Sequence, residues 1–460
     1  MARSLPPLCL LAALLTGCQS YRPSPLDLGG HASRWASRDA AAPEVAEYAA
    51  RLAALGEAAT EPFDAADGLS LREAEAVALF FNPRLRVARL TAKVPLVGAK
   101  EAGRWEDPEL AIDGERIIES VDDPWVLGGT ISFTVPLSGR LGVERGRAFA
   151  EADAGRLRAY VEEAAVLADL RRAWAEWTAA RQRHELATQY LGALDEVLRS
   201  AEALLRAKEV DATDVRPFQI ERATRRAELQ SLGLQQRQQE AWVKALLGLV
   251  PEAQVELHPS FPQTNSPTPA PAAPQWIKEN HPAVLLARAE YAAAEKALEL
   301  EVRKQYPDLT LGGGYATDEG QSRILFGAGL PLPLLNRNRR AIAEARANRD
   351  VARAAAEGEV EDLVGQLFRA RLAAEAARER RRLIETDAIP LADRQIDDLR
   401  RLGRLGDFNT LALLEALRTG YEAKVQLLGA RAAEAVAANE LNALAGTAWL
   451  PRPVAKDGGR

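Results

Sequence analysis

Residues 330–347 read LPLPLLNRNRRAIAEARA, and they join a strand-like pattern to a long helical one. The leucines alternate with prolines, which end sheet pairing because they lack a backbone N–H, and strong helix formers follow. From about 340 to 401 the only proline is Pro390. Roughly sixty helical residues would extend about 90 Å, far longer than a compact domain. The stretch therefore predicts a strand that runs directly into a very long helix.

The same order of features occurs earlier in the chain. Residues 135–140, VPLSGR, precede a proline-free run from about 144 to 205. Each half also opens with an X-Pro pair, at 82–83 and at 281–282, followed by an alanine-rich stretch. This repetition predicts two copies of one structural unit. The predicted parts are a signal peptide at 1–17, an N-terminal extension at 18–68, repeats at 69–250 and 276–447, a proline-rich linker at 251–275 and a disordered tail at 448–460.

Each repeat contains two segments that alternate with period two, the pattern of a strand with unlike faces. In one of them Ile131 and Phe133 fall on one face, and Thr130 and Ser132 fall on the other. Segments of about ten residues are long enough for a tilted strand that crosses a bilayer. Periodicity alone fits a small soluble hairpin packed on a helix equally well. The predicted strands are 108–118, 126–137, 307–316 and 323–334.

Each long helix is expected to end at a tight turn, from which a second helix returns. The turns lie at 208–211 and 403–407, and the returning helices run to about 249 and 446. Apolar residues recur at steps of three and four in a narrow, alanine-rich stripe. That stripe predicts helices packed closely side by side, as in coiled coils.

The N-terminus carries an export signal. Arg3 is followed by the apolar stretch 8–15, which is too short to span a bilayer, and then by Leu-Thr-Gly-Cys at 15–18. This sequence resembles the lipobox of bacterial lipoproteins, in which the signal is removed and Cys18 becomes the acylated N-terminus. Gln19 after the cysteine favours the outer membrane. The alternative is an ordinary signal peptide with a cysteine there by chance.

The composition argues against several function classes. The chain has 59 basic and 65 acidic residues, for a net charge of −6, and both signs alternate instead of forming basic blocks, which disfavours a nucleic-acid partner. The four histidines are scattered, without the paired spacing of a metal site. No catalytic constellation and no phosphate-binding loop are present. We therefore expect no enzyme, no cofactor and no bound metal.

The repeated order of helix, strand pair, long helix, tight turn and returning helix resembles the TolC-like outer membrane efflux protein family. Residues 330–347 look like the same passage in its heavy-metal members of the cobalt–zinc–cadmium type. The resemblance implies a mainly α fold with a membrane β part. Long helical hairpins would form an α-barrel tunnel, continuous with a β-barrel made of four strands per chain and closed by a homotrimer. It also implies a passive exit duct, partnered by a periplasmic adaptor and by an inner-membrane transporter of the resistance-nodulation-division type.

The resemblance places the adaptor contacts and the gate at the hairpin tips. Lys208 stands where the family usually has glycine, which leaves the shape of the first turn open. A ring of carboxylates at a constriction attracts cations, whereas the alternative for each carboxylate is a solvated side chain at a helix start. The adaptor-contact candidates are Lys208, Glu209, Val210, Gly403, Leu405 and Gly406. The gate candidates are Asp211, Asp214, Asp407 and Glu415, with Arg404 as a pairing partner.

Two other functions remain open from the sequence. One is a lipid-anchored periplasmic coiled-coil adaptor or scaffold without a pore, and the other is an envelope enzyme. An adaptor would need no strands of bilayer length, so the strand pairs distinguish it from a duct. The absence of site chemistry disfavours the enzyme.

Overall fold

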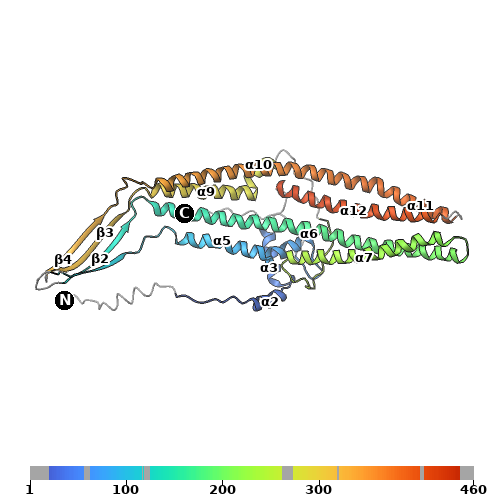
Figure 1. The fold of residues 1–460 in the computed structure, drawn as a ribbon, viewed down its shortest axis with the longest axis horizontal. Coiled ribbons are helices and arrows are strands. Elements are labelled where there is room, and N and C mark those ends of the chain that lie inside the picture. The colour runs from blue at the N-terminus through green and yellow to red at the C-terminus, as the bar shows by residue number, and fades with distance from the viewer. Residues whose placement is uncertain are drawn as a thin grey trace.

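The structure is a computed structural model of the chain, and it describes residues 20–55, 63–116, 118, 125–261, 273–318, 321–404 and 409–445. The molecule is elongated: long helices lie along its axis, and the strands form a sheet that projects beyond one end of them (Figure 1). This confirms the prediction of a mainly helical fold with four strands per chain.

The first half contains helices α2 to α7 and strands β1 and β2. Their bounds are α2 Leu28–Ala36, α3 Pro43–Leu55, α4 Leu71–Phe81, α5 Pro83–Glu101, β1 Glu109–Arg116, β2 Trp125–Val135, α6 Arg140–Arg206 and α7 Ala212–Leu246. The second half follows the same order. Its elements are α8 Ala273–Asn280, α9 Pro282–Arg303, β3 Leu309–Asp318, β4 Gln321–Gly329, α10 Arg339–Leu383, the π-helical turn η1 Ile384–Ala388, α11 Ile389–Arg404 and α12 Thr410–Ala445.

The four strands form one antiparallel sheet in the order β1-β2-β3-β4. Each half contributes one hairpin, and the halves join between β2 and β3, where Gly129 pairs with Tyr315 and Ile131 with Gly313. The joint depends on glycine: a Cβ atom on Gly314 would lie 2.6 Å from the carbonyl oxygen of Gly129. Strands β1 and β4 are therefore the two edges of the sheet.

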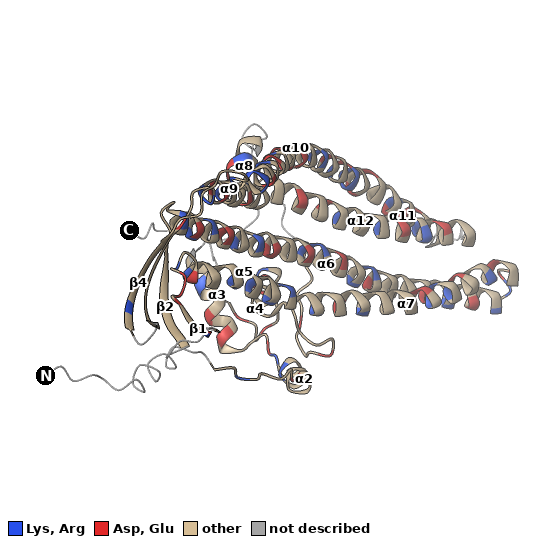
Figure 2. Ribbon diagram, turned by 60° about the vertical axis from the view of Figure 1, so that its left-hand side comes forward, with Lys and Arg blue, Asp and Glu red and all other residues tan. Residues whose placement is uncertain are grey.

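The long helices form a layer with the same kind of order. Helix α6 lies in the middle, with α5 and α7 on one side and α9 and α12 on the other. Helices α10 and α11 lie beyond α9 and α12 (Figure 1). The layer thus has two outer edges, one made by α5 and α7 and the other by α10 and α11. Charged residues of both signs are interspersed along these helices, whereas the sheet carries few (Figure 2).

The main core packs where the N-terminal helices meet α6 and α7. Trp174 and Trp177 on α6 are fully buried there, beside residues of α4, the end of α7 and the segment that follows it. That segment returns to the start of α4 through a parallel bridge between Leu69 and Leu257. Helices α2, α4 and α8 were not predicted from the sequence, because short helices carry little pattern of their own, and α4 and α8 are stabilised by burial.

The X-Pro pairs start equivalent helices in the two halves. Proline occupies the first helical position of α5 and of α9, where no N–H is needed. The side-chain oxygen of Asn82 accepts a hydrogen bond from the backbone N–H of Arg84 at 2.9 Å. Its amide nitrogen donates to the carbonyl of Leu246 at 2.8 Å, which ties the end of α7 to the start of α5. In the second half, Nδ1 of His281 accepts from the N–H of Ala283 at 3.3 Å.

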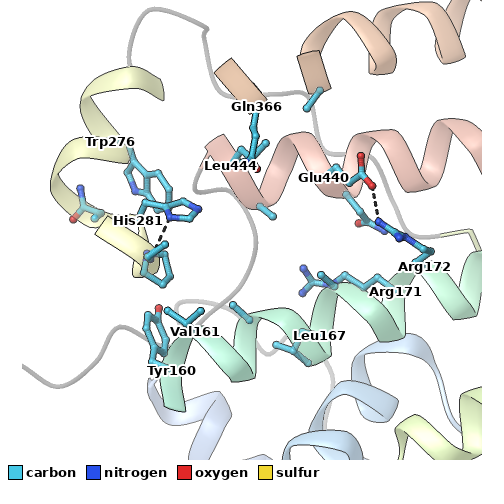
Figure 3. A pocket seen from close by; sticks show the side chains of 18 of the residues that line it. Tyr160, Val161, Leu167, Arg171, Arg172, Trp276, His281, Gln366, Glu440 and Leu444 are labelled. Carbon is cyan, nitrogen blue, oxygen red and sulfur yellow. Dashed lines mark hydrogen bonds and ion pairs between the residues drawn. The ribbon is translucent and has the colours of Figure 1, made fainter. Parts of the chain in front are cut away.

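His281 makes the second half acid-sensitive. It is half-buried beside Trp276, at the edge of a cavity of about 840 Å³ between α6, α9, α10 and α12 (Figure 3), and burial lowers its pKa to about 4. The native ring stays neutral down to about pH 4, whereas an unfolded histidine takes up a proton near pH 6.5. Stability is therefore complete above pH 6.5 and is lost as the pH falls toward 4, by on the order of 2 kcal/mol.

Replacing His281 by asparagine, the residue at the equivalent position of the first half, will keep the cap and remove this loss. The measurement is the urea midpoint of the detergent-solubilised protein between pH 7 and pH 4. As the pH falls, the urea midpoint of the wild type is expected to fall more steeply than that of His281→Asn. His184→Asn, which removes a histidine whose carbonyl accepts from Thr188 but which caps no helix, is the control. Equal slopes for all three proteins would contradict the prediction.

One strand and one helix differ from their predicted extents. Strand β4 ends at Gly329, so the predicted strand 323–334 is too long, because Pro331 and Pro333 have no N–H for pairing. The second long helix, predicted as continuous from about 340 to 401, is interrupted by η1. Pro390 lacks the N–H that would bond four residues back, and a π-helical turn just before it accommodates that loss. In the first half, α6 is an unbroken helix of 67 residues, about 100 Å long.

Candidate functional site: the two-faced sheet and the hairpin tips

One face of the sheet is apolar and exposed. The strand register aligns Leu110, Ile131, Gly313 and Phe326 in one row across all four strands. Phe326 is 88% exposed, so the apolar face is not covered by a helix. Other large exposed side chains on this face are Ile112, Trp125, Leu127, Phe133, Leu311, Tyr315 and Ile324.

The opposite face is mostly polar or small, although on β4 it also carries Leu325, which is 41% exposed, beside Arg323. It carries the carboxylates of Glu109, Asp113 and Glu115 on β1, hydroxyl residues on β2, and glycines on β3. A soluble hairpin packed on a helix would bury its apolar face, whereas this sheet leaves its apolar face exposed. The arrangement is that of a membrane strand, with apolar residues toward lipid and polar residues toward a lumen.

The first hairpin tip is a tight helix end built around Lys208. Lys208 has φ of 64°, the left-handed conformation that favours glycine. Its N–H donates to the carbonyl of Leu205 at 3.0 Å, and that of Glu209 donates to the carbonyl of Leu204 at 3.0 Å. This is the Schellman pattern that often ends helices. The turn therefore keeps a glycine-like shape with lysine in place, which answers the question that the sequence left open.

Lys208→Gly is expected to stabilise the protein by about 1 kcal/mol, because it removes the clash of a Cβ atom in the left-handed region. The measurement is the midpoint of urea unfolding, followed by circular dichroism in detergent. Ala207→Gly, one residue earlier at φ of −76°, is the matched control and should destabilise by about 0.5–1 kcal/mol. Destabilisation by both substitutions would contradict the assignment.

The candidate acidic residues near the first tip lie at the start of α7. Asp211 is exposed, and its N–H donates to the carboxylate of Asp214 at 3.0 Å, as in a capping box. Asp214 thus has a structural role in starting the helix. The neighbouring Val215 and Phe218 are fully buried in a cluster that Val210 and Leu414 also contact. This cluster brings the first turns of α7 and α12 together.

The second tip is described only in part. Glu415 is exposed on α12, next to the packed Leu414, so it lies close to the start of α7. Gly403 is in the last turn of α11, which ends at Arg404. Leu405, Gly406 and Asp407 lie outside the described residues, as do Cys18 and the tail 448–460. The role of each tip residue stays a prediction.

A cluster that the sequence analysis missed joins the two hairpins. Tyr190 of α6 stacks on Tyr421 of α12, with ring centroids 4.5 Å apart, and the Arg225 guanidinium of α7 lies 4.9 Å from the Tyr421 centroid. Arg225 also binds the carboxylates of Glu221 at 2.7 Å and Glu228 at 2.6 Å. We call these five residues the Tyr–Arg cluster. The sequence shows the helical spacing of Glu221, Arg225 and Glu228 along α7. It carries no signal that brings the two tyrosines together.

The hydrogen bonds of the Tyr–Arg cluster are satisfied. The Tyr421 hydroxyl donates to Glu228 at 3.1 Å, and the Tyr190 hydroxyl donates to Glu221 at 3.3 Å. Burial, reinforced by Glu228, raises the pKa of Tyr421 to about 12, so this hydroxyl keeps its proton. Burial opposes the charge on Arg225, but the bonds to Glu221 and Glu228 outweigh it and raise the pKa.

Within the described part of the chain, no group of three or more histidine, cysteine, aspartate or glutamate side chains is placed to hold a metal ion. Among the helices described, none is both long enough and apolar enough to cross a membrane.

Comparison with known proteins finds similarity to outer membrane efflux proteins. Residues 273–447 match the family model of outer membrane efflux proteins. The chain is 27% identical over 255 residues to the cobalt-zinc-cadmium resistance protein CzcC of Cupriavidus metallidurans. That match covers 54% of this chain and 60% of CzcC, which is less than two thirds of the relative's length.

Solved structures share the fold. The outer-membrane channel OprN superimposes with a TM-score of 0.71 at 18% identity, over 85% of this chain and 95% of OprN. The outer membrane protein VceC of Vibrio cholerae superimposes with a TM-score of 0.69 at 17% identity, over 82% and 96%.

Proposed function

We propose that this chain, whose residues 273–447 match the family model of outer membrane efflux proteins, is one subunit of a gated exit duct in a tripartite efflux pump. The observation that carries the proposal is the exposed apolar face of the four-stranded sheet, which continues directly into the layer of long helices. A two-faced sheet on a helical layer suits a conduit that leaves the membrane as a barrel and crosses the periplasm as a tunnel.

The free edges support closure by identical copies. In a bilayer the unpaired edges of β1 and β4 need partners, and β1 of one copy can pair with β4 of the next. The helical edges can meet in the same head-to-tail sense, α5 and α7 against α10 and α11, which generates a ring. Three copies of a four-stranded sheet would give a twelve-stranded barrel, so we propose a homotrimer. Exposed apolar residues on the helical edges are Val87, Leu90, Val94, Val97, Ile220, Leu234, Trp242, Val351, Phe368 and Leu372.

The location and partners follow from this assembly. We propose that the chain is acylated on Cys18, lies in the bacterial outer membrane and extends into the periplasm. The tips of the two hairpins would contact a periplasmic adaptor, and an inner-membrane transporter of the resistance-nodulation-division type would supply the energy. The Schellman turn at Lys208 and the packed start of α12 support a rigid docking surface at the tips.

We propose heavy-metal cations as the cargo. The relative CzcC is named for cobalt, zinc and cadmium resistance, and the passage at 330–347 resembles that of metal-exporting members. Carboxylates on the polar face of β1 would favour cations in the lumen of a closed barrel. The main alternative is a lipid-anchored adaptor or scaffold without a pore. Such a protein would not require a sheet with an uncovered apolar face.

The test is single-channel conductance of the detergent-extracted protein in planar bilayers. Asp214→Asn and Glu415→Gln remove charge, and the asparagine retains an oxygen that can cap α7. Cation-preferring steps whose preference falls in both variants would support a duct gated by these carboxylates. Glu375→Gln on α10, an exposed carboxylate paired with Arg371, is the control and should leave the preference unchanged. A soluble monomer that never conducts would contradict the duct and favour the adaptor.

A further inference from the structure

Apolar residues continue past the last paired residue of β4. In the sequence, Leu330, Leu332 and Leu334 follow Ile324 and Phe326 at steps of two, although pairing has ended at Gly329. All three are exposed, Leu334 at 69%, and the adjacent Leu335 is 93% exposed. The passage between β4 and α10 therefore presents four leucines at the helical end of the sheet.

This passage is held in place by its own hydrogen bonds. The Asn338 side chain donates to the backbone carbonyl and to the carboxylate of Glu301, both at 2.8 Å, which fixes the passage to the end of α9. Arg337 donates through Nε to the carbonyl of Pro333 at 3.1 Å. Arg337 and Asn338 both have positive φ, so the chain turns sharply before α10. These hydrogen bonds therefore fix the backbone that carries the leucines.

Three arginines follow the leucines within one helical turn. Arg337, Arg339 and Arg340 are all exposed, and the Arg340 side chain is 89% accessible although it pairs with Glu344 at 2.8 Å. We call Leu330 to Arg340 the leucine–arginine collar. Along the molecule it presents leucines next to the sheet and guanidinium groups one step further toward the helices.

The first half shows that the fold does not require such a collar. At the equivalent passage Leu137 is exposed, but Arg140 is held between the carboxylates of Glu106 at 2.7 Å and Asp308 at 3.0 Å. The Arg140 side chain is only 18% exposed. The arginine of the first repeat is held in ion pairs, whereas the three arginines of the second repeat are exposed.

The length of β4 indicates where the leucine–arginine collar lies relative to the membrane. Nine residues at about 3.4 Å rise span about 30 Å, and a tilt of about 40° reduces this to about 23 Å along the membrane normal. The apolar band of a membrane barrel is about 25 Å tall, so the strand alone ends slightly short of it. The leucines that follow Gly329 therefore begin at the helical edge of this band. The arginines then fall at the level of the phosphates, where long cationic side chains are stable.

We propose that the leucine–arginine collar binds phospholipids of the periplasmic leaflet, with its leucines among the acyl chains and its guanidinium groups on the phosphates. The inference rests on the proposed function, since it needs the sheet to lie in a bilayer. A second copy would add at the edge of β4 through the backbone, whereas these leucines lie beyond Gly329, the last paired residue of that strand. Lipid is therefore the occupant that their position favours.

Spin labels test the leucines. The proposed processing removes Cys9 and acylates Cys18, the two cysteines of the chain, so Leu334→Cys can be labelled specifically in the trimer reconstituted in vesicles of phosphatidylethanolamine and phosphatidylglycerol. Phe326→Cys marks the sheet, and Ser200→Cys marks an exposed site on α6, in the middle of the helical layer and away from its two edges. We expect oxygen to relax the labels at 326 and 334 and a water-soluble nickel chelate to relax the label at 200. A label at 334 that is reached by nickel, or by neither reagent because another copy covers it, overturns the collar. A label at 326 that is reached by nickel overturns the membrane sheet itself.

Native mass spectrometry tests the arginines. Arg337→Gln/Arg339→Gln/Arg340→Gln is expected to bind phosphatidylglycerol about fivefold more weakly for each charge removed. The matched variant is Arg369→Gln/Arg371→Gln/Arg380→Gln, which removes three exposed arginines from the body of α10 and should bind lipid like the wild type. Equal loss in both variants, or no loss in either, overturns the assignment.

Discussion

Phe326→Arg will prevent the sheet from inserting into a membrane, whereas Leu325→Arg, one residue away, will not. The two residues lie at the same level of β4 but on opposite faces: Phe326 aligns with Ile131 on the apolar face, and Leu325 aligns with Gly314 and Thr130 on the polar face. An arginine toward lipid near the bilayer midplane costs about 2–4 kcal/mol, and one toward a lumen costs little. In a trimer the cost applies three times.

The measurement is the amount of trimer recovered from the outer-membrane fraction, together with urea-dependent insertion into preformed vesicles. Phe326→Arg should leave little or no trimer, and Leu325→Arg should give wild-type amounts. Thr130→Arg and Ile131→Arg repeat the comparison on the central strand β2. Equal tolerance of arginine on both faces would contradict a membrane sheet, and equal loss on both would mean that the faces are buried alike.

Much of the fold could be predicted from pattern, because its elements are long and repeated. The alternation around Ile131 and Phe133 predicted strands with two faces, and the proline-free runs predicted α6 and α10. Alternation could not distinguish a membrane strand from a soluble one, since both have an apolar face. That distinction needed the surroundings of the sheet, where Phe326 and Ile324 remain exposed.

Other features depend on contacts that no local pattern records. The interruption at η1 follows from Pro390, but proline in a helix permits a kink, a break or a π-helical turn, and packing selects among them. At the first tip, the lysine at 208 was a visible departure, yet its left-handed conformation appears only in the structure. The gate candidates are similar: Asp214 could be recognised as an acidic residue near a tip, but its bond to the N–H of Asp211 could not.

The Tyr–Arg cluster is the clearest case, and it leads to the second large expected effect. Tyr190, Arg225 and Tyr421 come from α6, α7 and α12, and Tyr190 and Tyr421 are far apart in the sequence. The Arg225 side chain is only 14% exposed, and it neutralises Glu221 and Glu228 while Glu422 lies 3.7 Å away. Without the guanidinium these carboxylates would repel one another in a partly buried place. Arg225→Met is therefore expected to destabilise the protein by about 3 kcal/mol, because breaking a buried pair leaves uncompensated charge.

The measurement is the free energy of unfolding in urea, with Arg418→Met as the control. Arg418 pairs with Glu422 at 3.0 Å on α12, but both side chains are about half exposed, so its removal should cost less than about 1 kcal/mol. The triple variant Arg225→Met/Glu221→Gln/Glu228→Gln also removes the unpaired carboxylate charges. If these charges cause the loss, the triple variant should regain most of the lost free energy of unfolding. A loss in the triple variant as large as in Arg225→Met alone would assign the effect to the stacking of Arg225 on the two tyrosines. The hairpins would then be joined by packing and not by ion pairs.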